Sequence, residues 1–267
     1  MKISTMEGQL KVSIITVVYN GGKTIEDTIL SVASQSYPFI EHIIIDGVST
    51  DDTLSVVRKH KNKITRVISE PDKGLYDAMN KGIKCATGDI IGILNADDVY
   101  YDEDCISLVV KEFKEKGVGA VYGNLVYVSF DNLTKIIRYY NSNSFTIEQF
   151  AHGLMPAHPT FFVYKKNYEK FGLYKTEYLI AGDFELLVRF LYTNKVSYSC
   201  LPKVLVKMRM GGVSTRNLKS NWILNMEVLR ACKENMIKTN LIKIWSKYFI
   251  KLYQFIQRPN LQNPGRH

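Results

Sequence analysis

The sequence predicts an α/β protein whose central sheet is doubly wound and mostly parallel, and two features carry this prediction. First, the nearly continuous, β-branched apolar runs at residues 12–19 and 41–46 have the pattern of strands buried on both faces of a parallel sheet. Second, segments with helical spacing follow these runs at residues 24–35 and 52–61. Alternation of the two patterns over this much chain is typical of a doubly wound sheet.

The first strand ends at Asn20-Gly21-Gly22, and the helix after it carries Ile25, Ile29 and Val32 on one side before Pro38 closes the unit. The same alternation continues to residue 116. The remaining elements expected in this part are a strand at 64–68, a helix at 76–85, a strand at 89–94 and a helix at 102–116. Acidic residues open the last helix, where they suit its positive N-terminal dipole.

Beyond residue 118 the pattern becomes mixed. Strand-like pieces are expected at 120–130, 136–140, 160–164 and 204–210, with a helix at 183–192. From residue 218 onward the chain is helical and basic. We therefore expect two parts, a catalytic domain at 1–215 and a basic amphipathic helical extension at 216–267.

Composition limits the class of protein. The chain has 267 residues, 46% hydrophobic and 23% charged, which is enough apolar material for a sizeable core. A formal charge of +9 leaves nucleic acid, an anionic membrane surface or phosphorylated small molecules as partners. No recognised nucleic-acid motif accompanies this charge, so nucleic acid is not expected as a partner.

The cysteines and the N-terminus indicate a location. Cys85, Cys105, Cys200 and Cys232 form no C-x-x-C pair, which argues against a zinc site or a disulfide framework and fits a reducing cytoplasm. The N-terminus has no signal h-region followed by a cleavage site, and no apolar run approaches 18 residues. We expect a cytoplasmic protein with at most peripheral membrane contact.

Polar residues follow three of the predicted strands, at Tyr19-Asn20, at Asp46 and at residues 95–98. Ligands of open α/β sheets lie beyond the carboxyl ends of the strands, so these side chains are expected to converge. Adjacent carboxylates at Asp97 and Asp98 repel each other unless a cation or sugar hydroxyls satisfy them. Mg²⁺ or Mn²⁺ held by carboxylates and phosphates is one solution. A plain acidic turn before the next helix is the alternative.

Two common nucleotide motifs are missing. Gly22-Lys23-Thr24 resembles the end of a P-loop, but Val17 stands where that motif needs glycine. No G-x-G-x-x-G follows the first strand, which argues against a dinucleotide-dependent oxidoreductase.

Four ordered motifs carry a family resemblance: residues 12–20 (VSIITVVYN), residues 45–53 (IDGVSTDDT), residues 80–82 (NKG) and residues 95–98 (NADD). Together they resemble the family 2 inverting glycosyltransferases of GT-A fold, over about residues 11–215. The resemblance implies a metal-dependent enzyme that transfers one sugar from a nucleotide-diphosphate donor, for which a UDP-sugar is the commonest choice.

The resemblance also assigns site residues. It implies that Tyr19 and Asp46 contact the nucleotide base, that Asp97 binds the ribose or the metal, and that Asp98 binds the divalent ion, Mn²⁺ or Mg²⁺. Residues 181–189 are similar to the segment that holds the family's catalytic carboxylate, which makes Asp183 the candidate base. A helix N-cap is the alternative role for Asp183.

Further candidates border these residues. Asn20, Asp72 and Lys73 are expected beside the donor, and Arg209 and Ser214 lie in a segment similar to the family's loop over the donor phosphates. His158 and Glu185 are candidates for the acceptor loop, His158 with a structural role as the alternative. The chain departs from the family pattern at Asn95, often Asp, and lacks a histidine near Met210, so the third metal ligand is undefined.

The acceptor is expected to be a saccharide or lipid-linked saccharide in lipopolysaccharide, capsule or exopolysaccharide synthesis. The absent Q-x-x-R-W signature favours a single transfer. In the tail, Ile242, Trp245, Phe249, Leu252 and Ile256 recur at helical spacing opposite Lys243, Lys247 and Lys251. This stripe predicts either contact with the inner face of the cytoplasmic membrane or packing on the catalytic domain or a partner subunit, such as a second copy in a homodimer.

Two other functions remain open at this stage. A sugar nucleotidyltransferase shares the fold type, and Asn20-Gly21-Gly22-Lys23 is a thin version of its glycine-rich loop. The second is a non-catalytic module that binds a nucleotide or a membrane, which would bind its ligand without turning over a nucleotide sugar.

Overall fold

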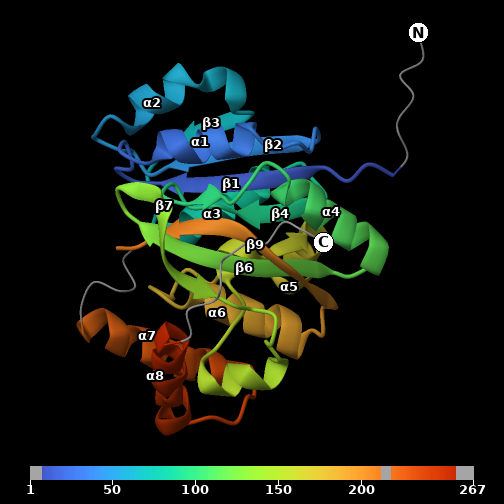
Figure 1. The fold of residues 1–267 in the computed structure, drawn as a ribbon, viewed down its shortest axis with the longest axis vertical. Helices are drawn as coiled ribbons and strands as arrows, with labels where there is room; N and C mark the ends of the chain where they lie inside the picture. Colours follow the sequence, from blue (N-terminus) through green and yellow to red (C-terminus); the bar gives the residue numbers. More distant parts are fainter. Residues whose placement is uncertain (1–7, 212–217, 257–267) are drawn as a thin grey trace.

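The computed structural model describes residues 8–211 and 218–256, and Figure 1 shows a central sheet with helices on both sides. The sheet has nine strands in the order β3-β2-β1-β4-β8-β6-β9-β5, with β7 paired to β6. The strands are β1 (Val12–Val18), β2 (Ile40–Asp46), β3 (Arg66–Ser69), β4 (Ile90–Ile93), β5 (Val99–Tyr100), β6 (Ala120–Ser129), β7 (Asn132–Tyr140), β8 (Phe162–Tyr164) and β9 (Tyr198–Arg209). The predicted α/β fold is confirmed.

The helices connect and cover these strands. They are α1 (Ile25–Ala33), α2 (Thr53–Lys59), α3 (Leu75–Cys85), α4 (Cys105–Lys116), α5 (Lys165–Phe171), α6 (Gly182–Leu187), α7 (Leu218–Glu234) and α8 (Leu241–Ile256). Short 3-10 turns lie at η1 (Lys61–Lys63), η2 (Ile147–His152) and η3 (His158–Thr160), and η4 (Val188–Thr193) continues α6 as a π-helical turn.

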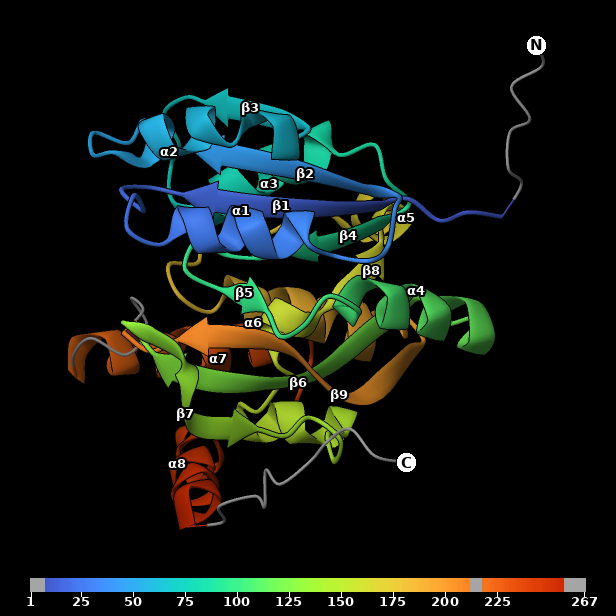
Figure 2. The same ribbon diagram turned by 45° about the horizontal axis from the view of Figure 1, so that its top comes forward.

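The sheet has two halves of different character (Figure 2). β1 pairs in parallel with both β2 and β4, and β3 pairs in parallel with β2, so their carboxyl ends meet at one edge. Beyond β4 the pairing becomes mixed, because β8 runs antiparallel to both β4 and β6 while β9 runs parallel to β6. The first half matches the alternating sequence pattern, and the second half matches the mixed one.

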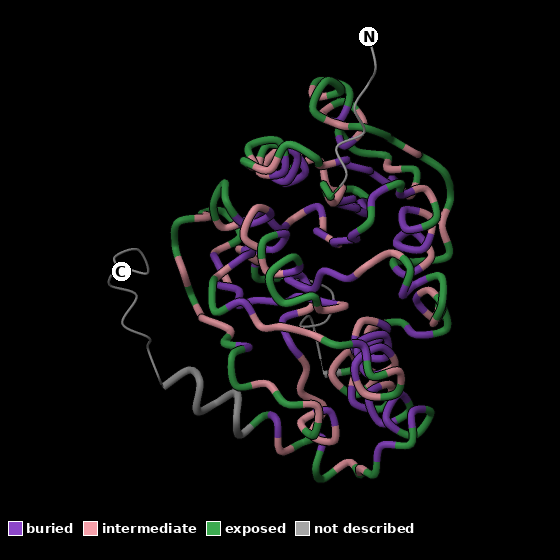
Figure 3. The backbone as a smooth tube through the Cα atoms, turned by 90° about the vertical axis from the view of Figure 1, so that its right-hand side faces the viewer, coloured by how far each residue is buried: buried purple, intermediate pink, exposed green. Residues whose placement is uncertain are grey.

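Buried residues concentrate along the sheet and the inner faces of its helices (Figure 3). α3 packs so closely on this core that a Cβ at Gly82 would lie 2.3 Å from Ile15 Cγ2 of β1. Any larger residue at position 82 would push this helix off the sheet.

Four elements differ from the sequence-based expectation. β7 begins at Asn132 and β9 at Tyr198, earlier than the predicted 136 and 204, and the sequence did not predict β5 or α5. β5 has only two residues, and α5 is a polar segment of seven residues, KKNYEKF, so neither carries a periodic apolar signal. β5 pairs with β9 and contacts α1, and α5 packs on β8 and η4, so tertiary contacts support both elements.

The C-terminal helices pack against the α/β part of the chain, since α7 contacts α6, and α8 contacts both η2 and α7. Within the predicted apolar stripe of α8, Ile242 and Trp245 are 81% and 46% exposed, whereas Ile244 and Lys247 are buried. At Ile242 and Trp245 the stripe does not pack on the rest of the chain, and its contact with a membrane or a partner subunit stays a prediction. The predicted boundary near residue 215 lies outside the described residues, and no described helix is long and apolar enough to cross a bilayer.

Candidate active site

Three of the predicted site residues surround the backbone of Gly47, just beyond the end of β2. A Cβ at Gly47 would lie 2.4 Å from Asp72 Oδ2 and 3.5 Å from Tyr19 Cδ2. Asp46 is buried, and its carboxylate accepts hydrogen bonds from the Ser69 hydroxyl at 2.6 Å and from the Ser49 N–H at 3.2 Å. The Tyr19 ring is 66% exposed, so the cluster has one open aromatic face available to a ligand.

Asn20 joins the loops after β1 and β2. Its N–H donates to Ser49 Oγ at 2.8 Å, and its side-chain oxygen accepts from the Thr50 N–H at 2.9 Å. Asn20 has φ of 55°, a left-handed conformation that asparagine tolerates better than most residues. Lys73 donates its N–H to Asp77 at 3.0 Å near the start of α3, and its side chain is exposed. Asn20 thus shapes the loops at the carboxyl edge of the sheet, and Lys73 places an exposed side chain near the same edge.

The turn after β4 contains buried oxygen atoms without donors. Asp98 is fully buried, and its Oδ1 has no hydrogen-bond partner, nor does Oδ1 of Asn95. Burial raises the pKa of the Asp98 carboxyl well above its ordinary value, and the neighbouring Asp97 raises it further. Burial also raises the pKa of Asp97. Unsatisfied buried oxygens are costly, so this turn favours a cationic ligand.

The donor set of this turn fits a hard divalent cation, which prefers carboxylate and amide oxygens. Among residues 8–211 and 218–256, no group of three or more His, Cys, Asp or Glu side chains is arranged to hold a metal ion. A cation here would therefore need oxygens from elsewhere, such as ligand phosphates.

Arg209 has a different environment from the predicted phosphate loop. It is 5% exposed at the end of β9, and its guanidinium pairs with Asp27 and donates to the carbonyls of Asp97 at 2.7 Å and Phe130 at 3.0 Å. These contacts use the guanidinium to fix the Asp97 backbone. The assignment of Arg209 to a loop contacting phosphates is not supported by this geometry, and Ser214 lies outside the described residues.

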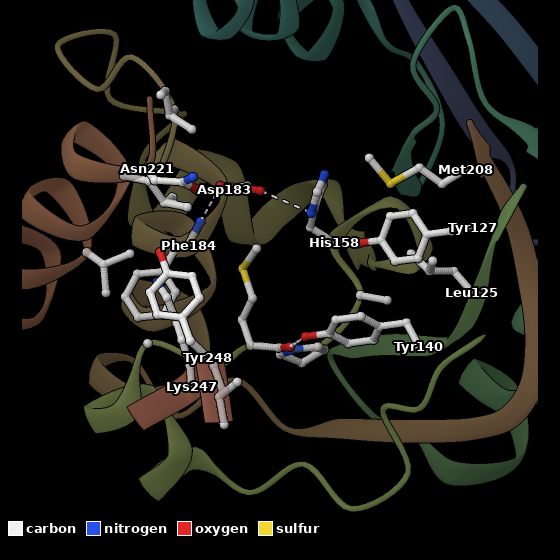
Figure 4. Close-up of a pocket in the computed structure, with 18 residues that line it drawn as sticks. Leu125, Tyr127, Tyr140, His158, Asp183, Phe184, Met208, Asn221, Lys247 and Tyr248 are labelled. Carbon is white, nitrogen blue, oxygen red and sulfur yellow. Dashed lines mark hydrogen bonds and ion pairs between the residues drawn. The ribbon is translucent and has the colours of Figure 1, made fainter. Parts of the chain in front are cut away.

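Asp183 and His158 form a pair on the other side of the site (Figure 4). His158 Nδ1 lies 3.1 Å from Asp183 Oδ2, and Asp183 Oδ1 accepts from the Phe184 N–H at 2.8 Å. Both side chains are partly exposed and line a pocket of about 180 Å³. The N-cap alternative for Asp183 is wrong, because the cap of α6 is Ala181 and Asp183 lies in the first turn.

Tyr127 of β6 links the two groups of carboxylates. Burial is the main cause of its raised pKa, and both Asp98 and Asp183 raise it further, whereas Arg138 lowers it. Tyr127 lines the pocket with Asp183, and the next residue, Val128, pairs with Arg209, whose guanidinium holds the Asp97 carbonyl, so the strand-end cluster and Asp183 border the same space. Tyr127 was not predicted as a site residue, because a tyrosine in a mostly buried strand has no pattern that separates it from the core.

Glu185 does not belong to this space. It is fully buried, and its carboxylate pairs with Arg189 at 2.9 Å and Lys175 at 3.0 Å. Arg189 in turn donates to the carbonyls of Gly172 and Leu173 at 2.9 and 2.8 Å. The geometry makes Glu185 a support for the segment before α6 rather than an acceptor-loop residue.

A family model, "Glycosyl transferase family 2", matches residues 13–172. An uncharacterized glycosyltransferase of Mycobacterium tuberculosis is 33% identical over 182 residues, 67% of this chain and 68% of that protein. The poly-β-1,6-N-acetyl-D-glucosamine synthase of Staphylococcus epidermidis is 35% identical over 116 residues, 42% of this chain but only 28% of the synthase.

Solved structures share the fold at low sequence identity. S. aureus TarS 1–349 in complex with UDP-GlcNAc has a TM-score of 0.69 and 17% identity, covering 90% of this chain and 73% of that one. A mannosyltransferase of Pyrobaculum calidifontis in complex with GDP-Man and Mn²⁺ has a TM-score of 0.60 and 19% identity, covering 94% and 82%.

Proposed function

Because the chain belongs to glycosyl transferase family 2, we propose that it is an inverting enzyme that moves one sugar from a nucleotide-diphosphate donor to an acceptor hydroxyl. The single observation that carries this proposal is that β6 connects the two groups of carboxylates: Tyr127 lines the pocket with Asp183, and Val128 pairs with Arg209, whose guanidinium holds the Asp97 carbonyl at 2.7 Å. A direct displacement needs a base on one face of the anomeric carbon and charge neutralisation on the other.

The donor is proposed to lie along the carboxyl edge of β1, β2 and β4. The exposed Tyr19 ring would stack on the base, with Asp46, Asn20 and Asp72 shaping the pocket beside it and Lys73 at its rim. A uridine diphosphate sugar is the proposed donor, a choice supported by the UDP-GlcNAc bound in the structural neighbour TarS.

The proposed divalent ion, Mg²⁺ or Mn²⁺, would be held by Asp98 and Asp97 together with the donor diphosphate. The support is the unpartnered oxygen of Asp98 in a fully buried turn. When bound, such an ion neutralises the charge of the departing diphosphate. Arg209 and Thr28 hold this turn through the backbone carbonyls of Asp97 and Asp98, at 2.7 and 2.8 Å.

Asp183 is the proposed general base. Its carboxylate accepts the proton of the acceptor hydroxyl as that oxygen bonds to the anomeric carbon, and the bond from that carbon to the diphosphate oxygen breaks on the opposite face. The configuration therefore inverts. His158 donates from Nδ1 to Asp183 and holds the carboxylate in place, which is the positioning role we assign to it.

The proposed acceptor is a lipid-linked saccharide at the inner face of the cytoplasmic membrane, in the synthesis of a surface polysaccharide. The polysaccharide synthase relative supports the pathway class. Exposed Trp222, Ile242 and Trp245 on the C-terminal helices support contact with a lipid surface. Flotation with phosphatidylglycerol vesicles tests this contact, and loss of binding is expected for Ile242→Ser with Trp245→Ser. Equal binding of this double variant would refute it.

The function is tested with a panel of nucleotide sugars, with Mn²⁺, Mg²⁺ or chelator, in the presence and absence of glycoside acceptors. We expect one donor to turn over with metal, and NMR of the product to show inversion. Asp98→Asn and Asp183→Asn should both lose turnover, while Asp131→Asn, at an exposed turn between β6 and β7, should not. Retained turnover in both variants would refute the proposal.

A further inference from the structure

The pocket beside Asp183 is built partly by the C-terminal helices, which lie outside the segment matched by the family model. That match ends at residue 172, and α7 begins at Leu218. Leu224 and Val228 of α7 and Tyr248 of α8 nevertheless line the same pocket as Asp183 and His158. Figure 4 shows Tyr127 and Tyr140 on one side of this pocket, with Phe184, Asn221 and Tyr248 on the other.

α7 is fixed to the segment that carries Asp183. The Glu227 carboxylate accepts three backbone N–H groups, from Leu179 at 2.7 Å, Ile180 at 2.9 Å and Ala181 at 2.8 Å. These amides immediately precede Gly182 and Asp183 in α6. The helix that forms the pocket wall therefore also sets the position of the proposed base.

The helices also pack tightly on the loop before η3. Gly153 has φ of 67°, and a Cβ there would lie 3.1 Å from Val228 Cγ1 and 3.3 Å from Ile244 Cγ2. Any side chain at position 153 would therefore crowd both helices, so the glycine lets α7 and α8 pack closely on this loop beside the pocket.

The lining has the chemistry of a site for one sugar ring. Tyrosine offers an apolar ring face together with a polar hydroxyl. The Tyr140 hydroxyl donates to the Met155 carbonyl at 2.8 Å, and the Arg138 guanidinium lies 5.4 Å from the centre of the Tyr127 ring, so both rings are held in place. Asn221, His158 and Asp183 provide polar groups among apolar neighbours.

The size of the pocket limits the ligand. Its volume of about 180 Å³ is below the roughly 300–1,000 Å³ of sites for drug-sized molecules. It has room for about one ring rather than a chain of sugars.

We propose that this pocket receives the terminal pyranose ring of the acceptor, end first, and that the C-terminal helices select which sugar enters. The inference rests on the proposed function. The sugar ring stacks between the tyrosine rings that line the pocket, with one of its hydroxyl groups at Asp183. Asn221 and Leu224 of α7 contact the other substituents of the sugar.

The test uses p-nitrophenyl monosaccharides as acceptors with full-length protein. Leu224→Trp narrows the pocket, and Asn221→Ala removes a polar group without adding bulk. Each change should raise the acceptor KM about tenfold or alter the preferred sugar, in the range that pocket contacts usually give. The donor KM and the rate of donor hydrolysis without acceptor should stay within about twofold. Lys219→Ala is the matched control, since this exposed side chain lies two positions before Asn221 in α7 and does not line the pocket.

Ligand-observed NMR of the same glycosides, with UDP present, separates this inference from the proposed function. Glycosides that bind wild type but not Leu224→Trp support the pocket even if no donor turns over, an outcome that refutes the transferase mechanism alone. Transfer with an unchanged acceptor KM and preference in both Leu224→Trp and Asn221→Ala overturns the pocket assignment and leaves the transferase standing.

Discussion

The strand-end cluster and the pocket beside Asp183 border one space but are built in different ways. The cluster comes from successive strand ends, at Tyr19, Asp46 and Asp98, whose convergence follows from parallel pairing. The pocket joins β6, β7, η3 and α6 to helices that follow much later in the chain. Parallel pairing brings the strand ends of the first region together, with Thr28 and Arg209 holding the Asp97–Asp98 turn, whereas the second region depends on packing between distant segments throughout. Changes to the two regions should therefore have separable kinetic effects.

The largest effect is expected from Asp183→Asn. An asparagine keeps the shape but cannot accept the proton of the acceptor hydroxyl, so the rate of transfer should fall by about 10²–10⁴. The donor KM should change little, because Asp183 lies on the pocket side of the site. Initial rates with saturating acceptor measure this, with Asp131→Asn as control. A large rise in donor KM would contradict the proposed separation between the donor site at the strand ends and the pocket beside Asp183.

Asp98→Asn should weaken donor binding and donor hydrolysis, which Asp183→Asn should leave nearly unchanged. Without the Asp98 carboxylate, the Asp97–Asp98 turn has one negative charge fewer to bind a divalent ion. The rates of donor hydrolysis and of transfer should both fall by about 10²-fold, the loss usually seen when one electrostatic group is removed. Calorimetric titration of UDP with Mn²⁺ should show weaker binding than in wild type. Unchanged Mn²⁺-dependent UDP binding would argue that the ion is held elsewhere.

Changes at His158 should give a smaller effect and define its role. His158→Ala removes the group held 3.1 Å from Asp183, and we expect the rate of transfer to fall about tenfold with donor KM unchanged. Asparagine places an amide nitrogen near the position of Nδ1, so His158→Asn should restore part of the rate. If His158→Asn is as slow as His158→Ala while added imidazole rescues His158→Ala, His158 carries the proton rather than positioning Asp183.

The same division explains how much could be predicted from the sequence. The β1 and β2 runs and the residues that follow them identify the fold and the strand-end cluster, because strand periodicity and parallel pairing are local rules. Arg209 and Glu185 have the right residue types at family-like positions, but both are buried and already paired, Arg209 with Asp27 and Glu185 with Arg189 and Lys175. Which face of α8 packs on the protein could not be predicted, because the hydrophobic pattern does not indicate a buried Lys247 or an exposed Trp245. Glu227 and Tyr127 gave no sequence signal, since tertiary contacts create their roles.

The smallest expected effect on activity concerns Glu41, which supports the half of the sheet that carries the strand-end cluster. Burial alone would raise its pKa, but hydrogen bonds from Ser13, Thr87 and Lys11 outweigh burial and lower the pKa from 4.5 to about 2. Because the folded-state pKa is depressed, the stabilisation is present above about pH 4.5 and is lost as the pH falls toward 2.

Glu41→Gln should therefore lower the free energy of unfolding by about 1–3 kcal/mol at pH 7. The difference between wild type and variant should shrink at pH 3, where part of the wild-type stabilisation is already lost. Urea denaturation at both pH values measures this, with Glu115→Gln as a control at a surface ion pair. An equal difference at both pH values would show that packing, rather than ionisation, makes Glu41 important. Since the carboxylate lies away from both substrates, donor and acceptor KM should stay unchanged in the folded variant.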